Sequence, residues 1–234
     1  MLDQGSIEES SSPWMAPAVY VRKMSGELRM CVHYRELNKQ TAKDAYPLPL
    51  PDEVQDQLTQ PQIFSALDLK SGYWQLPVHP EDHIKTAFRL GPGLGLYQFC
   101  RVPYGLSGAP SSFQHLMNKV LHGLSFATTY VDDILVHSTS EEEHKVHLRQ
   151  VFQRLREADL ILKGKKCHIG KTHVSYLGHV FSGTGMAPDP QKVQAVKDWP
   201  TPTFVTDVRQ FLCLASYYRR YISCLADIAA PCTL

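Results

Sequence analysis

Three things are missing from this chain of 234 residues: long apolar runs, closely spaced cysteine pairs and an excess of charge of one sign. No apolar run approaches the ~20 residues that cross a bilayer, so no membrane partner is expected. Residues 1–12 are polar and acidic, unlike a signal peptide, and an intracellular protein, cytoplasmic or nuclear, is therefore expected. The formal net charge of +1 neither supports nor excludes nucleic-acid binding.

The six cysteines show no C-x-x-C spacing, and a chain of this size needs no disulfide to fold. We expect reduced, mostly buried thiols. Cys167 and His168 are adjacent, but no second pair has zinc-ligand spacing, and packing is the favoured interpretation.

What is present indicates an ordinary globular protein, with 43% hydrophobic residues and enough length for a sizeable core. Short β-like runs at 18–22 and 28–32 flank Ser25-Gly26 and predict a hairpin. The mixture of elements predicts an α+β fold in which helices cover an antiparallel sheet. Further strands are expected at 63–69, 73–78, 86–90, 97–102, 128–137 and 174–181, and helices at 52–58, 107–121, 141–160, 190–199 and 205–222.

Two adjacent aspartates, Asp132 and Asp133, interrupt the apolar β-run at 128–137. A buried, unpaired carboxylate costs several kcal/mol, so a positive partner is expected. Consecutive strand residues face opposite sides, but a tight turn at the pair would bring both carboxylates to one edge. A polar turn at a hairpin tip is the alternative, and it would be favoured for an Asp-Asp pair without these apolar flanks.

Asp68 is a third acid inside an apolar run, at 63–69. Beside the pair it would complete an oxygen-only site, which suits Mg²⁺ or Mn²⁺. Two such ions about 4 Å apart can activate a 3′-hydroxyl and stabilise a leaving pyrophosphate. An acid that caps a local turn is an equally good explanation of Asp68 taken alone.

The order of short motifs resembles the reverse transcriptases of gypsy-type LTR retrotransposons, which are relatives of retroviral polymerases. The resemblance covers nearly the whole chain. Its motifs are Ser12-Pro13-Trp14, Arg35-Glu36-Leu37-Asn38-Lys39, Tyr46-Pro47-Leu48-Pro49, Leu67-Asp68-Leu69 with Ser71-Gly72-Tyr73, Lys85-Thr86-Ala87-Phe88, Pro103-Tyr104-Gly105-Leu106, Phe113-Gln114, Tyr130-Val131-Asp132-Asp133, Tyr176-Leu177-Gly178-His179 and Ser216-Tyr217-Tyr218-Arg219-Arg220.

This resemblance implies a right-hand polymerase fold and RNA-directed DNA polymerase activity. Its partners would be an RNA or DNA primer–template and dNTPs, and its cofactor two Mg²⁺ or Mn²⁺ ions at Asp68, Asp132 and Asp133. The implied organisation is a leader at 1–17, the first part of the fingers at 18–65, the palm with the remaining fingers at 66–182, and the thumb or start of the connection at 183–234.

The resemblance also implies a nucleotide pocket. Lys23 and Arg29 would grip the triphosphate, because cationic side chains suit phosphoryl transfer. Tyr73 would pack under the deoxyribose and exclude a 2′-hydroxyl. The other expected pocket residues are Leu69, Tyr104 and Gln114. Without the family, solvated hairpin charges would be the favoured explanation of Lys23 and Arg29. Ordinary packing is the alternative for Tyr73 and Tyr104, and a helix surface is the alternative for Gln114.

Nucleic-acid contacts are expected from Arg35 and from Arg209, Arg219 and Arg220, the last three on one predicted helix. The chain departs from the family at His33, where an aspartate is usual, in the glycine-rich connection 91–96, and at Cys213, where a glycine is usual. Relatives often form homo-oligomers, but no sequence feature locates such an interface. An RNase H region is expected in the parental polyprotein and is not recognisable within these residues.

Two alternatives remain open at this point. The chain could be a module that binds nucleic acid without extending a primer. It could also be an inert relic that keeps the motifs but lacks a stable fold, since a surface that later domains normally cover would be exposed.

Overall fold

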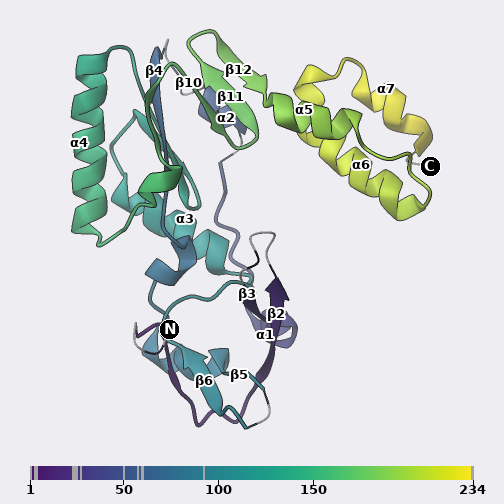
Figure 1. The fold of residues 1–234 in the computed structure, drawn as a ribbon. Helices are drawn as coiled ribbons and strands as arrows, with labels where there is room; N and C mark the ends of the chain where they lie inside the picture. The colour runs from purple at the N-terminus through teal and green to yellow at the C-terminus, as the bar shows by residue number, and fades with distance from the viewer. Residues whose placement is uncertain are drawn as a thin grey trace.

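The described residues form three separate sheets, with helices packed beside them (Figure 1). The computed structural model describes residues 2, 5–22, 26, 28–49, 51–56, 58, 61–91 and 93–232, with only the backbone described at 29, 51 and 55. Within these ranges, no helix combines the length and the apolar character needed to cross a membrane.

The central sheet has four strands in the order β7 (Ala127–Tyr130), β8 (Asp133–Ser138), β4 (Ile63–Asp68) and β9 (His168–Lys171). Its two middle strands are buried on both faces, which explains why β8 is a continuous apolar run. Ile134 and Val136 join one core cluster, whereas Leu135 between them joins another. Successive strand residues point to opposite faces, so the two cores lie on either side of the sheet.

Helices α3 (Ala109–Val120) and α4 (Glu141–Glu157) cover the first face of this sheet (Figure 1). Both were predicted from the spacing of their apolar residues. Ser140 caps α4 by accepting a hydrogen bond from the Glu143 N–H, and Leu148, Val151 and Leu155 form its buried stripe.

The second face is covered by α2 (Pro51–Asp56) and by a small sheet of β10 (His173–Tyr176), β11 (His179–Ser182) and β12 (Gly185–Pro188). The sequence predicted one strand at 174–181. The chain instead reverses between β10 and β11, where Leu177 and Gly178 both have positive φ, of 49° and 73°. A glycine in this region is what permits so sharp a turn.

The third sheet has the order β1 (Ile7–Glu9), β6 (Leu96–Phe99), β5 (Phe88–Arg89), β2 (Ala16–Arg22) and β3 (Leu28–Val32). It lies at the far end of the molecule from α5 and α6 (Figure 1). The predicted hairpin of β2 and β3 is present. The segment 1–17, expected to be a leader, contains β1, which pairs with β6 along its length.

Several short elements differ from the predictions. The segment expected as a strand at 73–78 begins as a 3-10 helix, η1 (Gly72–Gln75). The strand expected at 86–90 is shortened to β5, because η2 (Pro80–Thr86) extends to its first residue. Helix α1 (Arg35–Gln40), η3 (Gly164–Lys166) and strand β9 had not been predicted. All six cysteines are unpaired thiols, and contrary to expectation Cys213, Cys224 and Cys232 are exposed.

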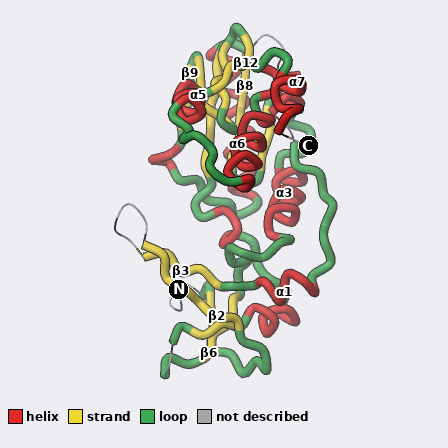
Figure 2. The backbone as a smooth tube through the Cα atoms, turned by 90° about the vertical axis from the view of Figure 1, so that its right-hand side faces the viewer, coloured by secondary structure: helices red, strands yellow, loops and turns green. Residues whose placement is uncertain are grey.

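The C-terminal part contains α5 (Pro190–Lys197), α6 (Val205–Tyr217), η4 (Arg219–Tyr221), α7 (Leu225–Ala229) and η5 (Ala230–Cys232). These helices lie beside the small sheet, away from α4 (Figures 1 and 2). Tyr217 and Tyr218 anchor them there: their hydroxyls donate to the carbonyl oxygens of Leu177 and Gly178, at 2.6 and 3.2 Å. The single helix predicted for 205–222 is therefore wrong beyond Tyr217.

Candidate active site

Asp68, Asp132 and Asp133 meet at one end of the central sheet. Asp68 is the last residue of β4 and lies directly opposite Asp133, the first residue of β8. In an antiparallel pair, directly opposed side chains lie on the same face. Val131 and Asp132 form the two-residue turn between β7 and β8, and the Leu69 N–H donates to the Asp132 carbonyl oxygen at 3.0 Å. The predicted convergence of the acids on one edge is present.

Gln114 of α3 supports the turn that carries Asp132. Val131 has φ of 52°, an uncommon conformation for a β-branched residue that surrounding contacts must maintain. The Gln114 Oε1 accepts a hydrogen bond from the Val131 N–H at 2.7 Å, and its Nε2 donates to the Thr129 carbonyl oxygen at 3.0 Å and to Asn118 Oδ1 at 2.8 Å. Gln114 is 0% exposed. Predicted to line the nucleotide pocket, it lies inside the protein as a support of the turn.

Gly72 packs against the same turn from the other side. A Cβ atom built on Gly72 would lie 2.8 Å from the Asp132 Cβ, a distance that real Cβ atoms essentially never show. Ser71 before it has φ of 57° and turns the chain from β4 into η1. The Ser71-Gly72 motif thus permits the close approach of two backbone segments around Asp132.

Burial and neighbouring negative charge raise the pKa values of Asp132 and Asp133. Burial, followed by the charges of Asp132 and Asp68, raises the pKa of Asp133 to about 6. Burial and the Asp68 carboxylate also raise the pKa of Asp132. These directions follow from removing charges from water and placing like charges close together. The site therefore carries more negative charge than its surroundings neutralise.

One cation is in contact with these acids. Lys166 of η3 donates from its Nζ to Asp68 Oδ2 at 2.8 Å, and this bond raises the pKa of the ammonium group. The sequence reasoning did not single out Lys166. The run Gly164-Lys165-Lys166 was the available signal, but nothing in the sequence shows that η3 returns to the end of β4.

The donor set is made only of carboxylate oxygens, which suits a hard divalent cation. Within the described ranges, one group of three metal-binding side chains has its ligand atoms all within 4.8 Å of one another. These acids do not belong to it. The structure thus brings the acids to one edge of the sheet without closing them into a chelating cluster. The Asp68 carboxylate is paired with Lys166 instead of with a metal ligand set. A cavity of about 360 Å³ adjoins Asp68 and Asp133, and its lining includes Lys165, Lys166, His168 and Tyr176.

Aromatic rings lie next to Asp132. The rings of Tyr73 and Tyr104 are 5.3 Å apart between centroids, and Tyr73 also meets Phe113 edge-on at 5.8 Å. Burial and the Asp132 charge raise the pKa of Tyr73. These two predicted pocket residues are thus together beside the acids. Leu69, also predicted there, is instead a fully buried member of the core.

Two of the predicted cationic residues are not fully described, and the others lie apart from the acids. Lys23 is not among the described residues, and only the backbone of Arg29 is described, on β3 opposite Val21. Arg35 is exposed at the start of α1.

The three C-terminal arginines, Arg209, Arg219 and Arg220, are all exposed. Arg209 lies on α6, but Arg219 and Arg220 lie on η4, so the single shared helix was wrong. Arg220 pairs with Asp52 of α2 at 3.1 Å.

Comparisons with known proteins agree with this arrangement. A family model described as reverse transcriptase (RNA-dependent DNA polymerase) matches residues 21–181. The chain is 39% identical over 240 residues to the retrovirus-related Pol polyprotein from transposon 297 of Drosophila melanogaster, covering 100% of this chain and 22% of that protein. It is also 37% identical over 241 residues to the retrovirus-related Pol polyprotein from transposon gypsy of Drosophila melanogaster, covering 100% of this chain and 23% of that protein.

A more distant relative is the transposon Tf2-3 polyprotein of Schizosaccharomyces pombe, 36% identical over 232 residues, covering 98% of this chain and 17% of that protein. The chain thus spans about a fifth of the length of these relatives.

Among solved structures, a foamy viral protease-reverse transcriptase in complex with double-stranded DNA has a TM-score of 0.90 at 24% identity, covering 99% of this chain and 41% of that chain. The same protein with an RNA/DNA hybrid has a TM-score of 0.87 at 24% identity, covering 99% and 31%. The fold is therefore the right-hand polymerase fold, and the predicted α+β class is confirmed. With the family match over residues 21–181, the chain belongs to the reverse transcriptase (RNA-dependent DNA polymerase) family.

Proposed function

We propose that this chain is the polymerase core of a reverse transcriptase, which extends a primer with dNTPs on an RNA or DNA template. The observation that carries the proposal is the meeting of Asp68, Asp132 and Asp133 at one strand end, where the described residues include one ion pair, between Lys166 and Asp68. Carboxylates that are partly buried and incompletely neutralised are typical of functional sites.

Asp68, Asp132 and Asp133 would hold two Mg²⁺ or Mn²⁺ ions. Bound there, the ions supply activation of the primer hydroxyl and stabilisation of the leaving pyrophosphate. The raised pKa values of Asp132 and Asp133 support this role, because a divalent cation relieves the mutual repulsion of the acids. Lys166 pairs with Asp68 as a counter-charge in the absence of metal.

Tyr73 and Tyr104 are proposed to form the sugar side of the nucleotide pocket, since their rings lie together beside Asp132. A bulky ring there would exclude a 2′-hydroxyl. Lys23 and Arg29 of the β2–β3 hairpin are proposed to bind the triphosphate. Gln114 is proposed to position the turn of Asp132, because its hydrogen bonds to Val131, Thr129 and Asn118 are all internal.

Three subdomains are proposed. Residues 18–65 supply the first part of the fingers, 66–182 the palm with the remaining fingers, and 183–234 the thumb or the start of the connection. The five-stranded sheet contains strands from both sides of this division, and β1 adds residues 7–9 to it. Arg35, Arg209, Arg219 and Arg220 are proposed to contact phosphates of the primer–template.

Primer extension tests the proposal directly. Purified protein is given poly(rA)/oligo(dT), dTTP and either Mg²⁺ or Mn²⁺, with Asp132→Asn as the matched variant. We expect incorporation by the parent chain and loss of most of it in the variant. Incorporation no greater than that of the variant would refute the proposal.

A second candidate is a module that binds primer–template without extending it. The separation of the three acids and the Lys166–Asp68 ion pair favour this candidate over full activity of the isolated chain. An electrophoretic shift without extension would identify it. Such binding should weaken as salt rises, because phosphate contacts release counterions.

A further inference from the structure

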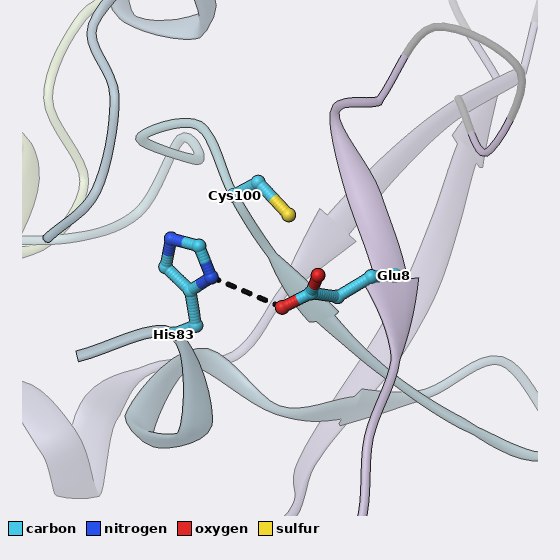
Figure 3. Close-up of side chains that lie close together, drawn as sticks. All are labelled: Glu8, His83 and Cys100. Atoms are coloured by element: carbon cyan, nitrogen blue, oxygen red, sulfur yellow. Dashed lines mark hydrogen bonds and ion pairs between the residues drawn. The ribbon is translucent and has the colours of Figure 1, made fainter. Parts of the chain in front are cut away.

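A cluster of three side chains with different metal-binding atoms lies in the five-stranded sheet. Glu8 comes from β1, His83 from η2 and Cys100 from the residue after β6. Their ligand atoms all lie within 4.8 Å of one another, which within the described ranges makes them a unique group. Figure 3 shows the Cys100 thiol, the His83 ring and the Glu8 carboxylate turned toward a common space.

The backbone brings the three together in a regular way. Glu8 lies directly opposite Gln98 on the paired strand β6, and Cys100 is two residues further along, on the same face. The Cys100 N–H donates to the Ser6 carbonyl oxygen at 3.0 Å, which continues the pairing past β6. Helix η2 then places His83 over this face.

Surrounding groups fix the orientation of the cluster. Gln98 Nε2 donates to Glu8 Oε1 at 2.7 Å, and Gln98 Oε1 in turn accepts from the Ser10 hydroxyl at 2.6 Å. His83 Nε2 lies 3.1 Å from the Val78 carbonyl oxygen. Metal-binding histidines almost always donate their second ring N–H to a carbonyl or carboxylate, and metal-binding carboxylates are themselves hydrogen-bonded.

The His83 ring lies between two acceptors, the Glu8 carboxylate and the Val78 carbonyl oxygen. With Nε2–H donating to the Val78 carbonyl, the His83 Nδ1 lies 3.0 Å from Glu8 Oε1. In a neutral imidazole this Nδ1 is a lone pair, and it would face a carboxylate that can only accept. The opposite tautomer, with Nδ1–H donating to Glu8, moves the lone pair to Nε2, against the Val78 carbonyl oxygen, whereas a metal cation on Nδ1 satisfies both contacts. The Cys100 thiol, which shares a hydrogen bond with Glu8, supplies a third metal-binding atom at the same place.

We propose that Glu8, His83 and Cys100 form a zinc site. A thiolate, an imidazole and a carboxylate are the ligands that Zn²⁺ takes in proteins, and Mg²⁺ does not select thiolate. Tetrahedral zinc with these ligands requires separations of about 3.3–3.6 Å between ligand atoms, so small side-chain movements complete the site. Water takes the fourth position, and the thiol proton leaves to solvent on binding.

The consequence of occupancy is mechanical. The ion would hold together β1, η2 and the end of β6. His83 and Cys100 lie 75 and 92 residues after Glu8 in the sequence. Closing such long loops stabilises the folded state relative to the unfolded chain. The site lies in a different sheet from Asp68, Asp132 and Asp133, so it is independent of the polymerase proposal.

Cobalt substitution is the direct test. The full chain is freed of metal with a chelator and titrated with Co²⁺ under reducing conditions, and the thiolate-to-cobalt absorption band is recorded. We expect a band that saturates at one equivalent and disappears on addition of Zn²⁺. Cys100→Ser should abolish it, and Glu8→Gln and His83→Gln should weaken binding at least about tenfold.

Matched controls separate this site from other thiols. Cys213→Ser and Cys224→Ser remove exposed cysteines and should leave the band unchanged. A band that persists in Cys100→Ser, or that Glu8→Gln and His83→Gln do not affect, would overturn the proposal and assign the metal to the exposed thiols.

Thermal unfolding gives a second measurement that needs no activity. Zn²⁺ should raise the melting temperature of the parent chain and of Cys213→Ser, but not that of Glu8→Gln, whose amide keeps the size of the carboxylate. Mg²⁺ at the same concentration should not reproduce the rise. Equal stabilisation of the parent chain and Glu8→Gln by Zn²⁺, or no stabilisation of either, would contradict the site.

Discussion

The two ends of strands β4 and β8 differ in how far their buried polar groups are satisfied by partners. At one end, Asp68 faces Asp133 with Asp132 beside them, and among the described residues Lys166 is the cation paired with Asp68. Toward the other end, the His144 ring lies between two hydroxyls, 2.7 Å from Ser65 and 2.8 Å from Ser138. Burial lowers the pKa of His144, so the ring is neutral and both nitrogens have partners.

The difference separates a stabilising network from a functional one. Satisfied neutral groups hold α4 against the sheet at little cost, whereas like charges at the acid end store repulsion that a bound cation can relieve. Changes at the two ends should therefore have opposite signatures: loss of stability at the histidine end, and loss of activity without loss of stability at the acid end.

Asp132→Asn should produce the largest effect. Removing one electrostatic contact to the reacting groups is expected to lower primer extension at least about 10²-fold. The melting temperature should not fall, because one of three repelling charges is gone. Extension assays and thermal unfolding of the same preparation test both statements, and a large drop in melting temperature would contradict the comparison.

His144→Ala should give the opposite pattern. The change leaves the buried hydroxyls of Ser65 and Ser138 short of a partner and opens a cavity, at a cost of about 2 kcal/mol. Chemical denaturation measures this loss, and the folded protein should extend primers normally. His122→Ala, on an exposed histidine, is the control and should change the free energy of unfolding by less than about 0.5 kcal/mol.

Gly72→Ala tests how closely the acid end is packed. The new Cβ atom would meet the Asp132 Cβ at 2.8 Å and displace the turn, so extension should fall about tenfold. Gly108→Ala is the control, since a Cβ atom there meets nothing within 4 Å. Equal activity of the two variants would show that the turn tolerates movement.

Asp133→Asn should give the smallest change in stability, and one that depends on pH. The pKa of Asp133 is raised from 3.8 to about 6, so the folded state keeps a proton that the unfolded state loses, and stability falls as pH rises through 6. The variant should be more stable than the parent by about 1 kcal/mol at pH 7, a value reduced for solvent screening, with no difference near pH 4.

The lowered pKa values of His137 and His144 act in the other direction. They remove stability as pH falls below 6.5, the value expected in the unfolded chain, because the unfolded state then binds protons that the folded state excludes. Both proteins share this loss, so the difference between them isolates Asp133. A difference that grows toward acid pH would contradict the assignment.

The sequence predicted those parts of the molecule that follow from local patterns. Apolar spacing located α3 and α4, and the acids within apolar runs located Asp68, Asp132 and Asp133. The position of Lys166 depends on how η3 returns to β4, and the role of Gln114 depends on a turn far from it in sequence. Such pairings are properties of the assembled fold, and periodicity within one segment carries no record of them.

Tyr73 and Glu8 illustrate the same limit. The segment after Asp68 has the composition of a strand, but the Ser71 turn and the close approach at Gly72 make it a 3-10 helix. Residues 7–9 look like a polar leader until β6 offers a partner strand, so the cluster of Glu8, His83 and Cys100 has no sequence signature.

Asp68 contacts the segment 163–166 through both its side chain and its backbone, which complicates the interpretation of substitutions at this position. Its carboxylate binds Lys166, and its carbonyl oxygen accepts from the Lys163 N–H at 2.8 Å. A substitution at 68 that lost activity would thus confound two causes, a missing ligand and a loosened 163–166 loop. Position 132, whose carboxylate makes no such tether among the described contacts, gives the cleaner null allele for separating chemistry from architecture.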